Sequence, residues 1–405
     1  MLPHPPSRIG KETSLSLRPF ESRDFAAVNA LHRGVWWPER SVAGWDWLAA
    51  NPARMDIDAP AGWVVEHEYP TEGPHHAAAF IGNMVQRVWK DDVMHHVATG
   101  FSVIVPPTMR GKSRQLIRAV LNQPNIAAGY TLNANPRSAP LYSRHGMAAW
   151  PARTHDLKLS WVIDPIDCLR SRFLREAVRR APRLADPYRE RFMRSGRPSL
   201  ADRALGRARP LRYPSQVTAL TDLTDGSLYG DFWQSLKSEG RVVADRSPEI
   251  LRWRTSDPDQ TTPPVMLAYT RNGAVTGFAM AILTKATPIE PVVLEVLDLV
   301  ALQDEPHAIP ALMRGLVDLA RSSGAAKVRL QVINEELKRR LGPWALAARR
   351  EGGWGHGHIR FRDGGDGLQN WSPTPFDGDH AFCQRPAPAK RTPTTGAVGR
   401  PARSG

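Results

Sequence analysis

The sequence predicts an α/β protein of two domains, and three observations support this prediction. Residues 101–147 follow the order strand, basic turn, helix, strand and loop. Residues 265–332 repeat this order more faintly. The chain has 405 residues, which is enough for two domains that each bury a core of their own. Two similar halves are therefore expected.

The first half begins with a short strand and a helix. Leu17–Phe20 has the apolar character of a strand. Ser22 precedes a helix that would turn Phe25, Val28 and Leu31 towards the core.

The most informative segment is a strand that leads into a basic turn. Residues 101–105 form a β-branched run that two prolines stop, and the turn Arg110–Gln115 follows. The free N–H groups and the positive dipole end of a helix N-terminus both favour an anion. Cations are unfavourable at that end, so three of them indicate an anion site rather than a solvated basic turn. The helix that follows has its apolar residues on one face: Leu116, Ile117, Val120 and Leu121.

This turn resembles the pyrophosphate-binding turn of the GNAT N-acetyltransferase superfamily, Arg/Gln-x-x-Gly-x-Gly/Ala. Arg110 matches the pattern, but Ser113 and Gln115 stand where the family has its later glycines. Their backbone amides can still donate, although the side chains narrow the approach to a phosphate. Ser113 is also a candidate cap for the helix.

The loop after the next strand carries a second resemblance to the same family. Residues 135–147 are similar to the signature Asn-x-x-x-Ala-x-x-Tyr-x-x-x-Gly-Phe, with Asn135, Tyr142 and Gly146 in matching places. The resemblance implies that Tyr142 protonates the leaving thiolate; the alternative is a tyrosine that packs on the core. It also implies acyl-CoA as co-substrate, with acetyl-CoA as the first candidate. The predicted CoA-binding residues are Val103, Val105, Arg110, Gly111, Lys112, Ser113, Arg114, Gln115, Asn135 and Ser138.

The general base is less well defined by the sequence. His96 follows His95 at a hairpin before the strand, and an imidazole can take an amine proton near neutral pH. We name His96 as the candidate. His145, Glu66 and Glu68 are alternatives, as is a chain of water molecules that makes a base unnecessary.

Four tryptophans crowd the stretch where GNAT proteins keep their acceptor-binding loop. Their faces suit a sugar or another flat acceptor, whereas the alternative is that they fill a thin core; core packing is expected for two of the four, and the sequence does not say which two. These residues are Trp36, Trp37, Trp45 and Trp47.

The second half repeats the order of elements without the basic turn. Residues 265–269 and 275–283 predict a hairpin, 292–302 a strand, and 328–332 a strand buried on one face. The turn 303–307 contains two acids that would repel a pyrophosphate, so this copy is not expected to bind CoA. The helix between these strands has an apolar face: Ile309, Leu312, Met313, Leu316, Val317 and Ala320.

The resemblance implies two GNAT-like domains, each a mixed, mainly antiparallel twisted sheet with helices on both faces. Two further segments, 248–254 and 371–379, are similar to uncharacterised tandem GNAT proteins of bacterial exopolysaccharide clusters. The predicted organisation is a disordered N-terminus over 1–13, an acyl-CoA-binding domain over 14–165, an arginine-rich connector over 166–212, a degenerate GNAT-like domain over 213–383, and a disordered basic tail over 384–405.

The amino-acid composition limits which cellular compartment and which kinds of site are expected. Cys168 and Cys383 are the two cysteines, too few for a disulfide framework or a cysteine-based zinc site. The paired histidines lack the spacing of a metal site, so no metal is expected. No apolar run approaches the length of a membrane span, and prolines interrupt the N-terminus where a signal peptide would be apolar. A cytoplasmic location is expected.

The net charge of +14 is concentrated in two regions. Between Arg170 and Arg212, fourteen arginines face four acids, and the tail from 384 has five cations and no acid. The two predicted globular halves are nearer neutral in charge, which argues against a general nucleic-acid-binding fold. The connector has three readings: a solvated linker, a contact with an anionic membrane, or a site for nucleic acid.

Together these features predict an N-acyltransferase that moves an acyl group from CoA to a small amine, with an amino sugar as one candidate acceptor. Two alternatives remain open. One is a non-catalytic scaffold in polysaccharide assembly, favoured by the missing glycines. The other resembles the Fem transferases, which use aminoacyl-tRNA, and the arginine-rich connector favours it.

Overall fold

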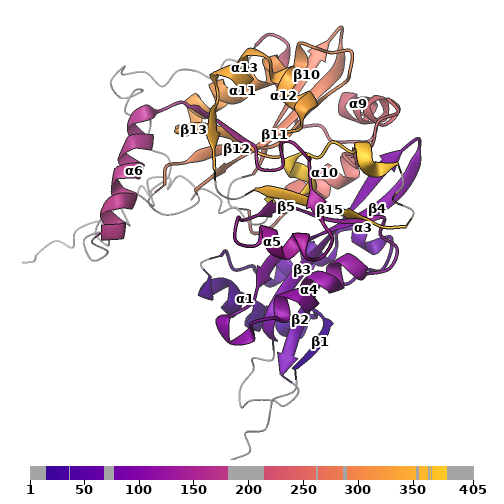
Figure 1. The fold of residues 1–405 in the computed structure, drawn as a ribbon. Coiled ribbons are helices and arrows are strands. Elements are labelled where there is room, and N and C mark those ends of the chain that lie inside the picture. Colours follow the sequence, from indigo (N-terminus) through magenta and orange to yellow (C-terminus); the bar gives the residue numbers. More distant parts are fainter. Residues whose placement is uncertain are drawn as a thin grey trace, which may run out of the picture.

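The structure is a computed structural model that describes residues 15–35, 37–67, 77–180, 214–260, 263–285, 290–352, 355–363, 365 and 367–380. The predicted N-terminal segment, the tail and residues 181–212 of the connector lie outside these ranges. Within the described residues the strands and helices follow the sequence patterns closely, and they form two sheets with helices packed on them (Figure 1).

The first sheet, sheet A, has the strand order β1-β2-β3-β4-β5-β15-β6, and β9 pairs with β3. All of its pairings are antiparallel except β4 with β5, which is parallel. Its strands are β1 (Leu15–Pro19), β2 (Gly62–His67), β3 (Ala77–Lys90), β4 (Val93–Ile104), β5 (Ala128–Ala134), β6 (Ala148–Ala149), β9 (Val243–Ala244) and β15 (His356–Phe361).

Helices pack on both faces of sheet A. Alternate residues of a strand point to opposite faces, so Val65 and Ile81 face α4 while Val64 and Phe80 face α1 and α2. The side chain of Trp45 is 2% exposed and closes the second of these cores. These helices are α1 (Phe25–Gly34), α2 (Val42–Ala49), α3 (Pro52–Met55), α4 (Lys112–Asn122) and α5 (Ala139–Ser143).

The second sheet, sheet B, has the order β14-β7-β13-β12-β11-β10-β8. Only β12 and β13 are parallel. The predicted hairpin is confirmed as β10 and β11, joined at Asn272-Gly273. The strands are β7 (Lys158–Val162), β8 (Val217–Ala219), β10 (Val265–Arg271), β11 (Ala274–Thr284), β12 (Val293–Ala301), β13 (Lys327–Leu330) and β14 (Arg349–Glu351).

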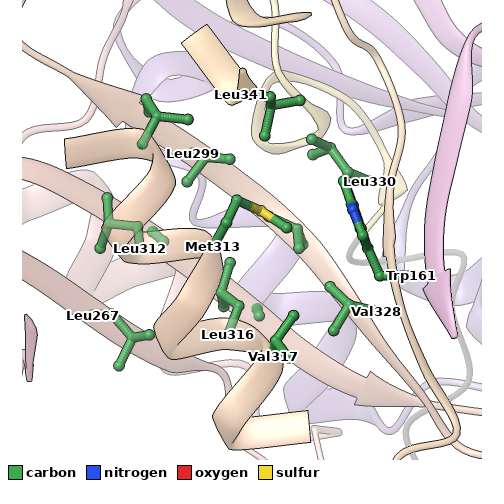
Figure 2. Close-up of a cluster of buried hydrophobic side chains, with 14 of the residues drawn as sticks. Trp161, Leu267, Leu299, Leu312, Met313, Leu316, Val317, Val328, Leu330 and Leu341 are labelled. Atoms are coloured by element: carbon green, nitrogen blue, oxygen red, sulfur yellow. The ribbon is translucent and has the colours of Figure 1, made fainter. Parts of the chain in front are cut away.

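Sheet B also carries helices on both faces. Helix α11 (Ala308–Ser323) inserts its predicted apolar face into the core shown in Figure 2, where Leu312, Met313 and Leu316 pack on the strands. Helices α9 (Leu228–Lys237) and α10 (Pro248–Thr255) form the core of the opposite face. The predicted fold class, two mixed and mainly antiparallel sheets with helices on both faces, is confirmed. The remaining helices are α6 (Pro165–Arg180), α12 (Glu335–Leu341) and α13 (Pro343–Ala347).

The two halves of the chain exchange strands. Strand β7 belongs to the first half of the sequence but pairs with β13 and β14 in sheet B. Strand β15 belongs to the second half but pairs with β5 and β6 in sheet A. Each sheet therefore contains a strand from the opposite half of the chain. A division of the chain into two domains near residue 165 does not account for this exchange. That domain division stays a prediction about independent folding units.

The segment 371–380 runs between the two sheets and is held by buried charges. The Arg246 guanidinium lies 2.7 Å from Asp298 on β12 and 3.0 Å from Asp377. The hydroxyl of Tyr130, on β5, donates a hydrogen bond to the Asp377 carbonyl, and the Arg254 guanidinium donates one to the Phe376 carbonyl at 2.9 Å. This segment therefore ties sheet A to sheet B.

Candidate acyl-CoA site

The parallel strands β4 and β5 separate towards their C-terminal ends. Their last paired residues are Thr99 and Tyr130. Beyond them β4 is irregular, because Ser102 has a φ of 50° and the register with β3 shifts at this point. A gap beyond the carboxyl ends of parallel strands is a common place for a ligand in α/β proteins.

A cavity of about 1430 Å³ opens at this gap and reaches sheet B. Residues 102–105 of β4 and its extension line one side, and residues 133–135 after β5 line another. Sheet B contributes charged side chains, and α6 lines part of the wall. The charged and polar lining residues from sheet B are Lys158, Thr284, Lys327, Arg329, Arg350 and Glu351, and those from adjoining loops and the C-terminal segment are Glu290, Gln331, Asp379 and His380.

The basic turn leads into α4 beside this cavity. Gly111 is the N-cap of α4 with a φ of 91°, a conformation that favours glycine, and no side chain caps the helix. The prediction that Ser113 caps α4 is therefore wrong; Ser113 lies inside the first turn and lines the cavity. Within the described ranges Arg110, Lys112 and Arg114 make no ion pair with an acid. Lys112 and Arg114 in the first turn and Arg110 just before the N-cap are thus three cations without an acid partner, at a helix start whose N–H groups no described side chain caps.

Six of the predicted site residues line the cavity and six do not. Those that line it are Val103, Val105, Ser113, Asn135, Ser138 and Tyr142. Five residues of the basic turn lie beside it, largely exposed: Arg110, Gly111, Lys112, Arg114 and Gln115. His96, the twelfth, lies elsewhere.

The loop before Tyr142 is built by its own side chains. Asn135 Oδ1 accepts hydrogen bonds from the backbone N–H groups of Arg137 and Ser138, both at 2.9 Å. Ser138 Oγ in turn accepts from the Asn135 N–H at 3.0 Å. These bonds start α5, which presents Tyr142 to the cavity. The Tyr142 ring stacks on His358 with ring centres 5.9 Å apart.

His96 is placed at the other end of β4. Its Nε2 lies 2.9 Å from the Asp56 carboxylate, which also binds Arg87 at 2.6 Å. The strand rise places it roughly 23 Å from Val103 along β4. None of the alternative bases lines the cavity among the described residues: Glu66 pairs with Arg18, and His145 is partly buried near Arg360. Glu68 lies outside the described residues.

The tryptophans divide between core and cavity. Trp45 is buried among aromatic rings, and Trp47 stacks on Trp253 with ring centres 4.8 Å apart. The expectation that two of the four fill the core is met by these two. Trp37 lines the cavity, and Trp36 lies outside the described residues.

Sequence reasoning missed the sheet B side of the cavity. The alternation of Lys327, Arg329 and Gln331 with buried residues correctly predicts a strand with one polar face. That face lies against the cavity. The sequence did carry one indication of this wall, because burying two cations on the same face of a strand costs free energy unless they serve a site. No sequence pattern, however, indicates that Lys158 and His380 lie near that face.

The corresponding turn of the second half is filled by its own side chains. Arg340 donates to the carbonyls of Leu302 and Glu305 at 2.7 Å and 2.9 Å, and Arg271 pairs with Glu305 at 2.8 Å. Trp344 Nε1 donates to the Pro310 carbonyl in the first turn of α11. Side chains of the protein itself therefore contact the start of α11, whereas the start of the corresponding helix α4 has no side-chain cap.

Among the described residues, no group of three or more His, Cys, Asp or Glu side chains is arranged to hold a metal ion. Nor does any helix in the described ranges combine the length and apolar character needed to cross a membrane.

No family model matches the chain, and no curated protein matches it in sequence. Solved structures do match its fold. Saccharomyces cerevisiae N-myristoyltransferase with bound myristoyl-CoA superposes with a TM-score of 0.53 at 11% identity, over 96% of this chain and 93% of that one. The same enzyme with myristoyl-CoA and inhibitors gives 0.53 at 10% identity, over 95% and 88%.

A GCN5-related N-acetyltransferase from Kribbella flavida matches with a TM-score of 0.46 at 15% identity, over 87% of this chain and 72% of that one. At such identities the likeness concerns the fold alone. The N-myristoyltransferase match confirms the predicted GNAT-like fold over nearly the whole chain.

Proposed function

We propose that the protein transfers an acyl group from acyl-CoA to a primary amine. The observation that carries this proposal is the coincidence of two features at one place. The gap between β4 and β5 opens into the cavity, and the uncapped, cationic first turn of α4 lies beside it. A pyrophosphate at the turn would direct the pantetheine arm along residues 103–105.

The reaction needs positioning more than covalent help from the protein. The neutral amine attacks the thioester carbonyl, an N–C bond forms, and the C–S bond breaks. Tyr142 lines the cavity, and in this proposal it gives its proton to the thiolate sulfur. Because His96 lies far along β4, the proton from the amine passes to water in this proposal.

The donor and acceptor are the less defined parts of the proposal. Acetyl-CoA is the donor that the sequence favours, and the fold match with N-myristoyltransferase makes a long-chain acyl-CoA the second donor to test. A small amine, such as an amino sugar, stays the predicted acceptor.

Calorimetric titration of acetyl-CoA, myristoyl-CoA and free CoA tests the site directly. Arg110→Ala/Lys112→Ala should weaken binding about tenfold or more, because charge-assisted hydrogen bonds to phosphate contribute roughly 1.5–3 kcal/mol. Lys338→Ala/Arg339→Ala, which removes two exposed cations from α12, is the matched control and should bind as the intact protein does.

Absence of binding to all three ligands by the intact protein would reject the proposal. The two alternatives from the sequence would then be distinguished by tRNA binding. Steeply salt-dependent binding would favour the Fem-like transferase, and no binding would favour the scaffold.

A further inference from the structure

One buried cation in the cavity wall has no acid to neutralise it. Lys158 begins β7, is 6% exposed, and lines the cavity from sheet B. Within the described part of the chain, neither an ion pair nor a hydrogen bond reaches its Nζ. Its cationic neighbours differ in this respect, since Lys327 lies 2.7 Å from Glu351 and Arg329 pairs with Glu295 and Glu351.

Two side chains beside Lys158 carry buried polar atoms without a hydrogen-bond partner. Gln331 Oε1 has no hydrogen-bond partner, and a Cβ on Gly355 would lie 2.7 Å from this oxygen and 3.7 Å from Lys158 Nζ. The oxygen and the ammonium are therefore neighbours across the same glycine. Both ring nitrogens of His380, which is 1% exposed, lack a hydrogen bond of acceptable geometry, although the Pro375 carbonyl lies near.

The charges around Lys158 decide which kind of ligand this part of the cavity can bind. Burial, followed by the positive charge of Arg329, lowers the pKa of Lys158 to about 8, so the ammonium still dominates at neutral pH. Burial lowers the pKa of His380 to about 3, with Lys158 as the second cause, so its ring is neutral. The acids of the cavity wall already have partners: Glu351 as above, Glu290 with Arg175 at 3.3 Å, and Asp379. Lys158 is thus a charge in excess.

The Lys158 side chain is largely buried and reaches the cavity without an acid partner, and the Gln331 amide oxygen is buried without a donor. An unpaired buried polar atom costs free energy, and native proteins tolerate this mainly at functional sites. The complementary ligand has an anionic group for Lys158 and an N–H donor for Gln331 Oε1. We propose that Lys158 and Gln331 form the acceptor subsite of the cavity, and that the acceptor is an amine carrying a carboxylate or a phosphate close to its nitrogen. This inference rests on the proposed acyl transfer.

The first test compares acceptors in pairs that differ in the anionic group. Alanine is paired with alaninamide, and phosphoethanolamine with ethanolamine, and kcat/KM is compared within each pair. The intact protein should favour the anionic member of at least one pair about tenfold or more, as a charge-assisted hydrogen bond predicts. The pair in which the preference appears identifies the anionic group of the acceptor as a carboxylate or a phosphate.

Variants then assign the preference to Lys158. Lys158→Met should bring the ratio within the pair close to one, and Lys158→Arg should retain part of it. Lys338→Met, which removes an exposed lysine on α12, should keep the ratio of the intact protein. Lys158→Met should melt no lower than the intact protein, because it replaces a largely buried side chain whose charge has no acid partner by an apolar one of similar length. A ratio unchanged in a folded Lys158→Met would overturn the proposal.

A second measurement separates this inference from acyl transfer itself. Lys158 is labelled with acetic anhydride in the absence of CoA compounds, and mass spectrometry follows its modification. Alanine or phosphoethanolamine should protect Lys158, while alaninamide and ethanolamine should not. Equal labelling in all four would overturn the acceptor subsite. Protection without any enzymatic transfer would uphold the subsite and reject the proposed reaction.

Discussion

Tyr142 shows how one residue can satisfy both interpretations of a sequence motif. Its ring stacks on His358 and packs against the core formed with α4, as a structural tyrosine would. It also lines the cavity at the end of a loop that Asn135 fixes by hydrogen bonds. The packing therefore holds the phenol in a defined place, which is what a proton donor requires.

Tyr142→Phe separates the two roles because it keeps the ring and removes the proton. We expect kcat for acyl transfer to fall about 100-fold or more, within the usual range for loss of a general acid, while the Kd of acyl-CoA changes little. Steady-state kinetics and calorimetry measure the two quantities, and the thermal midpoint shows whether the ring still packs. An unchanged kcat would assign Tyr142 to packing alone.

At the scale of elements, α6 has two unlike faces. Cys168, Ser171 and Arg175 line the cavity, whereas Leu169 and Phe173 on the other side are 66% and 75% exposed. Large apolar side chains with arginines on the same helix fit the membrane contact that the sequence raised as one of three possibilities. In Figure 1 the helix lies at the edge of the molecule.

Vesicle binding tests this reading of α6. The intact protein should sediment with vesicles that contain phosphatidylserine and much less with phosphatidylcholine alone, because arginines favour an anionic surface. Leu169→Ser/Phe173→Ser should reduce the bound fraction several-fold, since it removes the apolar contact and keeps the charge. The matched control is Leu346→Ser, which changes an exposed leucine on α13. Equal binding by all three proteins would leave α6 a solvated helix.

At the scale of the whole molecule, the exchange of β7 and β15 makes the halves interdependent. Sheet A without β15 would expose an edge of β5 whose residues are almost all buried, including Leu132 and Ala134. Sheet B without β7 would lose Trp161 and Leu159 from its core. The Arg246 ion pairs add a buried link, and buried pairs are strongly destabilising when one partner is lost.

We therefore expect that the chain unfolds in one calorimetric transition and that residues 14–165 alone do not fold. An exposed, apolar strand edge favours aggregation, so the fragment should be insoluble or bind a hydrophobic dye. Co-expression with residues 213–380 should restore solubility, because it supplies β15. A monomeric, cooperatively folding fragment would instead support the domain division that the sequence predicts.

The elements were predictable because their signals are local. The β-branched run before Pro106, the Asn272-Gly273 turn and the apolar stripe of α11 each lie within a few residues, and each became the expected element. The same holds for the first side of the cavity, where Val103, Ser113, Asn135 and Tyr142 lie on or beside the consecutive elements that carry the two sequence motifs.

The rest of the site was not predictable because it depends on contacts between distant segments. His96 was chosen for its chemistry, but the register of β3 with β4 places it beside Arg87 and Asp56. No local pattern indicates that Lys158 would face Gln331 and the C-terminal segment.

The sequence by itself determined the elements, the fold class, and the cationic turn that begins α4. These follow from periodicity and turn chemistry, which act over about ten residues. The tertiary structure alone decided which half completes which sheet, which tryptophans are buried, and which charges remain unpaired in the cavity. The reason is physical: burial and pairing are properties of neighbours in space, and here β7 and β15 bring in neighbours from the opposite half of the chain.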